Sequence, residues 1–102
     1  MKQINESELN ELQSQNKKIL LEIYTSWCPS CKVLLPRLEN MESNYSEVVF
    51  AKMNAEENTE YAMNLGIRSV PTVIVYDGKN IVNKSSGANP DSFYKEILNQ
   101  IQ

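Results

Sequence analysis

The 102-residue chain has no histidine and only two cysteines, which removes the ligands of most metal centres. Structural zinc and iron–sulfur sites usually need four Cys or His ligands. Two cysteines can contribute to such a site only if a second copy of the chain shares it. The sequence also contains nothing that resembles a nucleotide-binding loop. We therefore expect neither a metal nor any other cofactor.

The chain also lacks a long apolar run and an excess of positive charge. No stretch approaches the roughly 20 apolar residues of a membrane span, and the polar start over residues 1–6 has no signal-peptide character. The formal net charge is −3 without a Lys/Arg cluster, which argues against binding to nucleic acid or anionic membranes. We expect one cytoplasmic, monomeric domain over residues 1–102.

The two cysteines, Cys28 and Cys31, are separated by Pro29 and Ser30. If Cys28 is the N-cap of a helix, Pro29 takes the first helical position, where its missing N–H is no loss. The amides of Ser30 and Cys31 then point at the Cys28 sulfur, and the helix dipole lowers its pKa below the roughly 8.5 of a free cysteine. The spacing predicts a redox pair, with Cys28 as nucleophile and Cys31 as the more buried resolving thiol.

Two other interpretations of the cysteine pair are weaker. A metal site would need four Cys or His ligands, so the pair could take part in one only if two copies of the chain bridged it. A static structural disulfide would close a loop so short that it hardly constrains the unfolded chain. Because a four-residue motif is not decisive alone, its context must support the redox interpretation.

The N-terminus predicts a short edge strand over residues 1–4 and then a helix that runs to about residue 15. Asn5 and Glu8 form a capping box, in which each side chain accepts a hydrogen bond from the backbone N–H of the other residue. Ile4 and Leu9 occupy the positions of a hydrophobic staple. These signals place the helix start at Asn5.

Two buried strands are predicted over residues 19–25 and 47–53. The first is apolar on both faces apart from Glu22, as in a central strand that helices cover on both sides. A long helix should connect the two strands, and Pro36 should kink this helix rather than end it, because the apolar period continues through the proline. The apolar stripe consists of Leu34, Leu38, Met41 and Tyr45.

The second half of the chain predicts a helix over about residues 58–64 that stops at Gly66, a strand over 68–76, a strand over 80–84 and a C-terminal helix. Asp77-Gly78 predicts the hairpin turn between the two strands. Asn89 as N-cap and Pro90 at the first position should start the last helix, which buries Phe93, Ile97 and Ile101. This order predicts an α/β fold with a mixed four- to five-stranded sheet and helices on both faces.

Several segments together resemble the thioredoxin family. They cover nearly the whole chain in order and with near-family spacing, which is far more specific than the Cys-x-x-Cys motif alone. The resemblance implies a thioredoxin fold and a thiol–disulfide oxidoreductase that reduces protein disulfides. The segments are residues 21–32 around the cysteines, Pro36, residues 51–54, residues 66–72 and Gly87.

The resemblance also implies roles for individual residues. Cys28 and Cys31 match the nucleophilic and resolving cysteines, and Trp27 matches the tryptophan that flanks the active site. Pro71 matches a proline whose peptide bond with the preceding residue is cis in this family. Such a bond would place this loop against the Cys28 sulfur and offer the Val70 backbone to an extended substrate segment.

Glu22 stands where the family carries a buried Asp behind the second cysteine. Desolvation in a covered strand should raise the pKa of this acid, and perturbed acids cluster at working sites. We expect Glu22 to relay the proton of Cys31, although an acid that merely reaches solvent is the alternative. Lys52 matches a nearby lysine of the family and is a candidate partner of Glu22, but a strand-end surface cation is the simpler expectation.

The chain departs from the family pattern between the cysteines, where Pro29-Ser30 replaces the usual Gly-Pro, and at Tyr24, which replaces a tryptophan. The two middle residues tune Cys-x-x-Cys proteins between about −270 and −120 mV, so a glutathione-coupled or oxidising protein remains an alternative. A non-catalytic interaction module that binds one partner in the groove around Trp27, Val70 and Pro71 is the second alternative.

The partners follow from the resemblance as well. A thioredoxin-type reductant acts on disulfide-containing proteins and contributes to electron transport and cell redox homeostasis. A flavoprotein that resembles the NADPH-dependent thioredoxin reductase would return the oxidised chain to its dithiol form.

Overall fold

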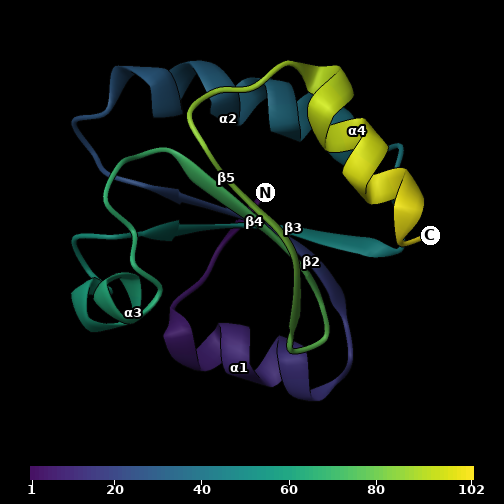
Figure 1. Cartoon of the computed structure of the whole chain (residues 1–102), viewed down its shortest axis with the longest axis horizontal. Coiled ribbons are helices and arrows are strands. Elements are labelled where there is room, and N and C mark those ends of the chain that lie inside the picture. Colours follow the sequence, from purple (N-terminus) through teal and green to yellow (C-terminus); the bar gives the residue numbers. More distant parts are fainter.

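The computed structural model describes all residues from Met1 to Gln102. Four helices and five strands alternate along the chain (Figure 1). None of the helices is long and apolar enough to cross a bilayer. In chain order the elements are β1 (Lys2–Gln3), α1 (Glu6–Ser14), β2 (Lys18–Tyr24), α2 (Pro29–Glu42), β3 (Val48–Asn54), α3 (Thr59–Asn64), β4 (Thr72–Asp77), β5 (Asn80–Ser86) and α4 (Asp91–Gln100).

The strands form one mixed sheet in the order β1-β3-β2-β4-β5. Strand β2 pairs in parallel with β3 and antiparallel with β4, while β1 pairs in parallel with β3. Parallel neighbours need a crossover connection, and α2 supplies it between β2 and β3. The predicted mixed sheet is therefore confirmed, with five strands.

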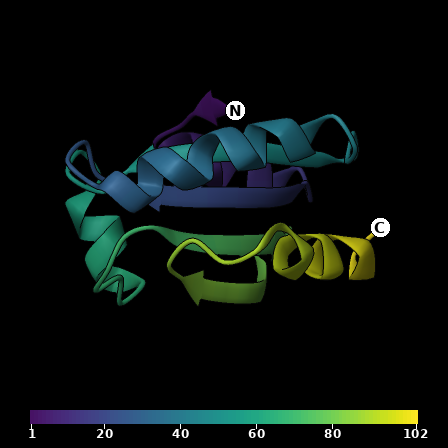
Figure 2. The same cartoon turned by 90° about the horizontal axis from the view of Figure 1, so that it is seen from above.

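Helices cover both faces of the sheet, with α2 and α4 on one face and α1 and α3 on the other (Figure 1). Seen from above, α2 crosses β2 and β3 while α4 lies on the side of β4 and β5 (Figure 2). Successive residues of a strand face opposite sides, so β2 contributes Leu20 to the core under α2 and Leu21 to the core under α1. The prediction of a central strand covered on both sides is confirmed.

The buried side chains form two apolar clusters. The cluster on the α2 and α4 face contains Leu20, Leu34, Leu38, Met41, Tyr45, Val48, Phe50, Val73, Val75, Tyr94, Ile97 and Leu98. The cluster on the α1 face contains Ile4, Leu9, Ile19, Leu21, Ile23, Ala51, Met53, Ile74 and Tyr76. The sheet thus separates two cores, and β2 supplies residues to both of them.

The predicted start of α1 is confirmed by its capping box. The Asn5 Oδ1 atom accepts a hydrogen bond from the Glu8 N–H at 2.8 Å, and the Asn5 N–H donates to Glu8 Oε1 at 3.1 Å. The staple residues Ile4 and Leu9 are both buried in the cluster on this face of the sheet. The local sequence therefore predicts correctly where this helix begins.

Helix α2 continues through Pro36 to Glu42, as the apolar period predicts. Gly78 lies in the turn between β4 and β5 and has a φ of +61°, which confirms the predicted hairpin. The Gly78 N–H also donates to the Lys17 carbonyl at 2.9 Å, which ties the hairpin to the start of β2.

The prediction of a strand over residues 68–76 is wrong at its start, because β4 begins only at Thr72. The Thr72 hydroxyl donates to the Ser69 carbonyl at 2.8 Å, and the Val70-Pro71 peptide bond is cis. Residues 69–71 therefore form a turn that the apolar pattern of the sequence does not distinguish from a strand. The strand proper begins after this turn.

The prediction of Asn89 as the N-cap of the last helix is also wrong. The N-cap is Pro90, which makes no side-chain capping hydrogen bond, and the helix begins at Asp91. The Asn89 side chain instead donates to the Ser86 carbonyl at 3.2 Å, at the end of β5. Tyr94 and Leu98 are fully buried in α4, whereas the predicted Phe93 and Ile101 are only half-buried.

Replacing Asn5 by alanine should lower the free energy of unfolding by about 1 kcal/mol, because the Glu8 N–H loses its capping oxygen. Asn10 lies exposed inside α1, so Asn10→Ala is a matched control that should leave stability unchanged or raise it. Urea unfolding measures both variants. Equal stability of Asn5→Ala and the wild type would mean that the capping box contributes nothing.

Candidate functional site

Both cysteines lie at the start of α2, directly after the central strand β2. Cys28 is the N-cap with an extended backbone (φ −86°, ψ 108°), and Pro29 takes the first helical position, as predicted. A disulfide joins Cys28 to Cys31, whose Cα atoms are 5.3 Å apart. Their exposed fractions are only 2% and 3%. The structure therefore places the two sulfur atoms on one element, within bonding reach.

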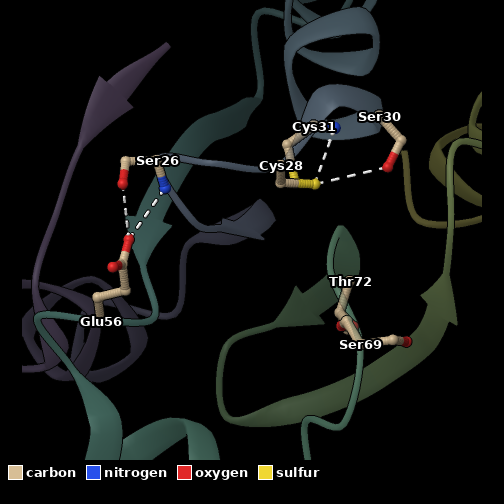
Figure 3. The surroundings of a disulfide bond; sticks show 7 residues. All are labelled: Ser26, Cys28, Ser30, Cys31, Glu56, Ser69 and Thr72. Carbon is tan, nitrogen blue, oxygen red and sulfur yellow. Dashed lines mark hydrogen bonds between the residues drawn. A yellow bond between two sulfur atoms is a disulfide. The ribbon is translucent and has the colours of Figure 1, made fainter.

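The Cys28 sulfur accepts two hydrogen bonds from the first turn of α2 (Figure 3). The Cys31 N–H donates to it at 3.2 Å, as predicted. The Ser30 hydroxyl lies 3.5 Å away and acts as the donor, because a disulfide sulfur carries no hydrogen. The prediction that the Ser30 amide is the second donor is wrong, since its hydroxyl takes this place.

The segment before the cysteines is held by an acid in the turn that follows β3. The Glu56 carboxylate accepts from the Ser26 N–H at 3.0 Å and from the Ser26 hydroxyl at 2.9 Å (Figure 3). These hydrogen bonds, the backbone one first, hold the pKa of Glu56 below its usual range. The sequence did not indicate this contact, because 30 residues separate the two side chains.

The predicted substrate-binding residues lie beside the disulfide. Trp27 is 67% exposed, and it lines a groove of about 220 Å³ together with Val70. The Val70-Pro71 bond is cis, as the resemblance implied, and Pro71 is buried. Figure 3 shows the turn between Ser69 and Thr72 facing the cysteines. The apolar wall of the groove is completed by Ala55, Ala62 and Ile67.

Glu22 lies behind the second cysteine. Its exposed fraction is 1%, and it lines a pocket of about 200 Å³ together with Cys31. Its Oε1 atom has no hydrogen-bond partner. Burial raises the pKa of this carboxyl to about 7, which the Lys52 ammonium opposes and the Glu39 carboxylate assists. The expectation of a buried acid with a raised pKa is confirmed.

Lys52 is the neighbour of Glu22 on β3 and lines the same pocket. It makes no ion pair with Glu22, since the ion pairs of the chain join other residues. Its ammonium instead lies 6.0 Å from the centre of the Tyr24 ring. Lys52 therefore acts on Glu22 through its charge, without direct contact.

Comparisons with known proteins agree with this architecture. The family model for thioredoxin matches residues 1–100. Thioredoxin from Mycoplasmoides gallisepticum is 35% identical over 94 residues, which cover 92% of this chain and 94% of that protein. Thioredoxin-2 from Saccharomyces cerevisiae is 30% identical over 90 residues, covering 88% of this chain and 86% of that protein.

The fold is shared with solved structures over the full length of the chain. A structure of Plasmodium falciparum thioredoxin matches with a TM-score of 0.89 and 29% identity, covering 100% of both chains. A structure of Fasciola hepatica thioredoxin matches with a TM-score of 0.90 and 26% identity, again covering 100% of both. This chain therefore belongs to the thioredoxin family and is a thiol–disulfide oxidoreductase of the protein-disulfide reductase type.

Proposed function

We propose that Cys28 is the nucleophile and Cys31 the resolving thiol of a cytoplasmic reductant of protein disulfides. The observation that carries this proposal is the Cys31 N–H directed at the Cys28 sulfur over 3.2 Å at the first turn of α2. A thiolate at this position accepts a charge-assisted hydrogen bond and lies at the positive end of the helix dipole. Cys28 is thereby the thiol that ionises first.

The reaction proceeds by two thiol–disulfide exchanges. The Cys28 thiolate attacks one substrate sulfur, so that a mixed disulfide forms while the substrate S–S bond breaks and the departing sulfur takes up a proton. Cys31 then loses its proton and attacks the Cys28 sulfur. This step closes the Cys28–Cys31 disulfide seen in the structure and releases the second substrate thiol. Two electrons have passed from the dithiol to the substrate.

The groove between Trp27 and Val70 is proposed to bind the substrate segment that carries the disulfide. Its wall is mostly apolar, and the exposed Trp27 ring offers a large contact area. The backbone of Val70 lies in a turn rather than in a ladder of the sheet, so its polar groups are free to pair with an extended peptide. Pro71 holds this segment at the start of β4.

Glu22 is proposed to accept the proton that Cys31 loses during the second exchange. It shares a pocket with Cys31, and its Oε1 atom has no other hydrogen-bond partner. A pKa of about 7 lets the carboxyl take up and return a proton near neutral pH. The pocket between the two residues offers the space for a water molecule to bridge them.

Recycling needs an electron donor. We propose a flavoprotein that resembles thioredoxin reductase and passes two electrons from NADPH to the Cys28–Cys31 disulfide, which places the chain in electron transport and redox homeostasis. Membership of the thioredoxin family favours this reductant over a glutathione-coupled or oxidising protein. The disulfide-forming pair likewise favours an enzyme over a non-catalytic interaction module.

Replacing Cys31 by serine should trap the mixed disulfide between Cys28 and a protein substrate, because the resolving thiol is gone. Cys28→Ser is the control and should trap nothing. Non-reducing gel electrophoresis followed by mass spectrometry identifies the cysteine in the adduct. Equal trapping by both variants would contradict the assigned roles, and an unimpaired biological role of the double serine variant would favour the interaction module.

Replacing Ser30 by alanine should raise the pKa of the Cys28 thiol by about 0.5–1, because the thiolate loses one hydrogen bond. In glutathione buffers the wild type should equilibrate near −270 mV, and the variant should be more negative by up to about 30 mV. Ser30→Thr retains the hydroxyl and should behave like the wild type. A wild-type potential near −120 mV would instead identify an oxidant.

Replacing Glu22 by glutamine should remove a pH dependence of stability. The folded chain retains the Glu22 proton up to a pKa of about 7, whereas the unfolded chain releases it near 4.5, so wild-type stability falls as the pH rises through this range. Above pH 8 the ionised Glu22 should lower the free energy of unfolding of the wild type by an amount on the order of 3 kcal/mol. The oxidised variant should therefore be more stable than the wild type at high pH, as measured by urea unfolding.

The same variant tests the proton relay. Disulfide exchange by Glu22→Gln should be slower than by the wild type between about pH 6 and 9, because Cys31 loses its proton acceptor. Glu47 is exposed and remote from the pocket, so Glu47→Gln is the matched control. Unchanged exchange rates of Glu22→Gln across this range would mean that Glu22 is a buried acid without a role in proton transfer.

A further inference from the structure

The hydroxyl of Tyr94 in α4 has no role in the proposed reaction. Its side chain is fully buried among apolar residues, where a phenylalanine would pack as well. Its hydroxyl nevertheless makes two hydrogen bonds with the segment before the helix. It accepts from the Asn89 N–H at 3.1 Å and donates to the Gly87 carbonyl at 3.2 Å. A buried hydroxyl is tolerated only when it is paired in this way.

The segment that Tyr94 holds is itself bonded to the proposed substrate-binding turn. The Gly87 N–H donates to the Pro71 carbonyl at 2.8 Å. Gly87 has a φ of +83°, a left-handed conformation that turns the chain from β5 toward α4. The Tyr94 hydroxyl therefore binds the carbonyl of the same residue, Gly87, whose N–H makes the backbone hydrogen bond to Pro71.

Helix α2 holds the same connection from the other side. The Arg37 Nε atom donates to the Asp91 carboxylate at 2.8 Å, and its Nη2 atom donates to the Asn89 carbonyl. Residues 87–91, which we name the connector, are thus held by one side chain from α4 and one from α2, in addition to the hydrogen bonds of the Asn89 side chain to the Ser86 and Gly87 carbonyls. Because α2 also carries Cys28 at its start, these contacts join the helix of the nucleophile to the Pro71 turn.

We propose that Tyr94 and Arg37 are positioning residues that, through the connector, set the affinity of the Pro71 turn for protein substrates. The proposal rests on the proposed substrate-binding role of Val70 and Pro71. Loss of either contact lets the connector move and weakens the hydrogen bond from the Gly87 N–H to the Pro71 carbonyl. The hydrogen bonds to the Cys28 sulfur come from Ser30 and Cys31 and not from Tyr94 or Arg37, so the chemistry of Cys28 itself should be unaffected.

The variant Tyr94→Phe tests the proposal, because it removes the hydroxyl and retains the ring. Amide hydrogen exchange of Gly87 should become about tenfold faster relative to the core amides of β2. With insulin as the protein disulfide, KM should rise about three- to tenfold at nearly unchanged kcat. The rate at which Cys28 reduces a small aromatic disulfide should stay at the wild-type value.

Tyr45→Phe is the matched control. Tyr45 is also buried beside α4 and loses one hydrogen bond, to Asn99, but it does not touch the connector. It should change neither Gly87 exchange relative to the core nor KM. Arg37→Met removes the contact between α2 and the connector. It should raise both the Gly87 exchange rate and KM, as Tyr94→Phe does, and it keeps the proposal testable if Tyr94→Phe folds poorly.

The outcomes separate this proposal from the proposed function. Wild-type exchange at Gly87 in both connector variants would overturn the positioning role, whether or not the protein reduces insulin. Faster exchange with an unchanged KM would overturn the link to substrate affinity, as would a KM increase that Tyr45→Phe shares. Failure of the wild type to reduce insulin would contradict the proposed function and leave the hydrogen-exchange result to decide the role of the connector.

Discussion

The main-chain N–H of Cys31, directed at the Cys28 sulfur, is the contact on which the site depends. It exists because Cys28 caps α2 and Pro29 fits the first helical position without losing a hydrogen bond. The sheet fixes where this contact lies. Since β2 and β3 are parallel, α2 must cross between them, and its first turn follows directly on the carboxyl end of the central strand. The first turn of α2 is therefore positioned by the topology of the sheet and also provides the N–H group that stabilises the Cys28 thiolate.

In the proposed mechanism, the two sides of this helix start serve different steps. Toward the protein interior, the Glu22 carboxyl shares a pocket with Cys31, and burial keeps its pKa near the pH at which a proton must move. Toward the surface, Trp27 and Val70 line an apolar groove that suits an extended peptide. A buried carboxyl and an exposed aromatic ring can lie near the same helix start because Glu22 belongs to β2, which is buried on both faces, whereas Trp27 lies in the exposed loop between β2 and α2.

The sequence predicted what local chemistry controls. The capping positions of Cys28 and Asn5 depend on residues within one turn, and the burial of Glu22 follows from the apolar run around it. The cis bond at Pro71 came from family resemblance, because no local rule distinguishes it. Contacts between distant segments were not predictable. A turn replaced the start of the expected strand at residues 68–71, and Asn89 bonds back to the end of β5 instead of capping α4, since tertiary contacts outweigh local preference.

The acidity of the Cys28 thiol tests the central claim most directly. In the reduced protein, alkylation by iodoacetamide as a function of pH, with the modified residue identified by mass spectrometry, measures the pKa of this thiol. A thiolate that accepts the Cys31 amide at a helix start should give a pKa at or below about 7.5. A pKa at or above the roughly 8.5 of a free cysteine would contradict the account.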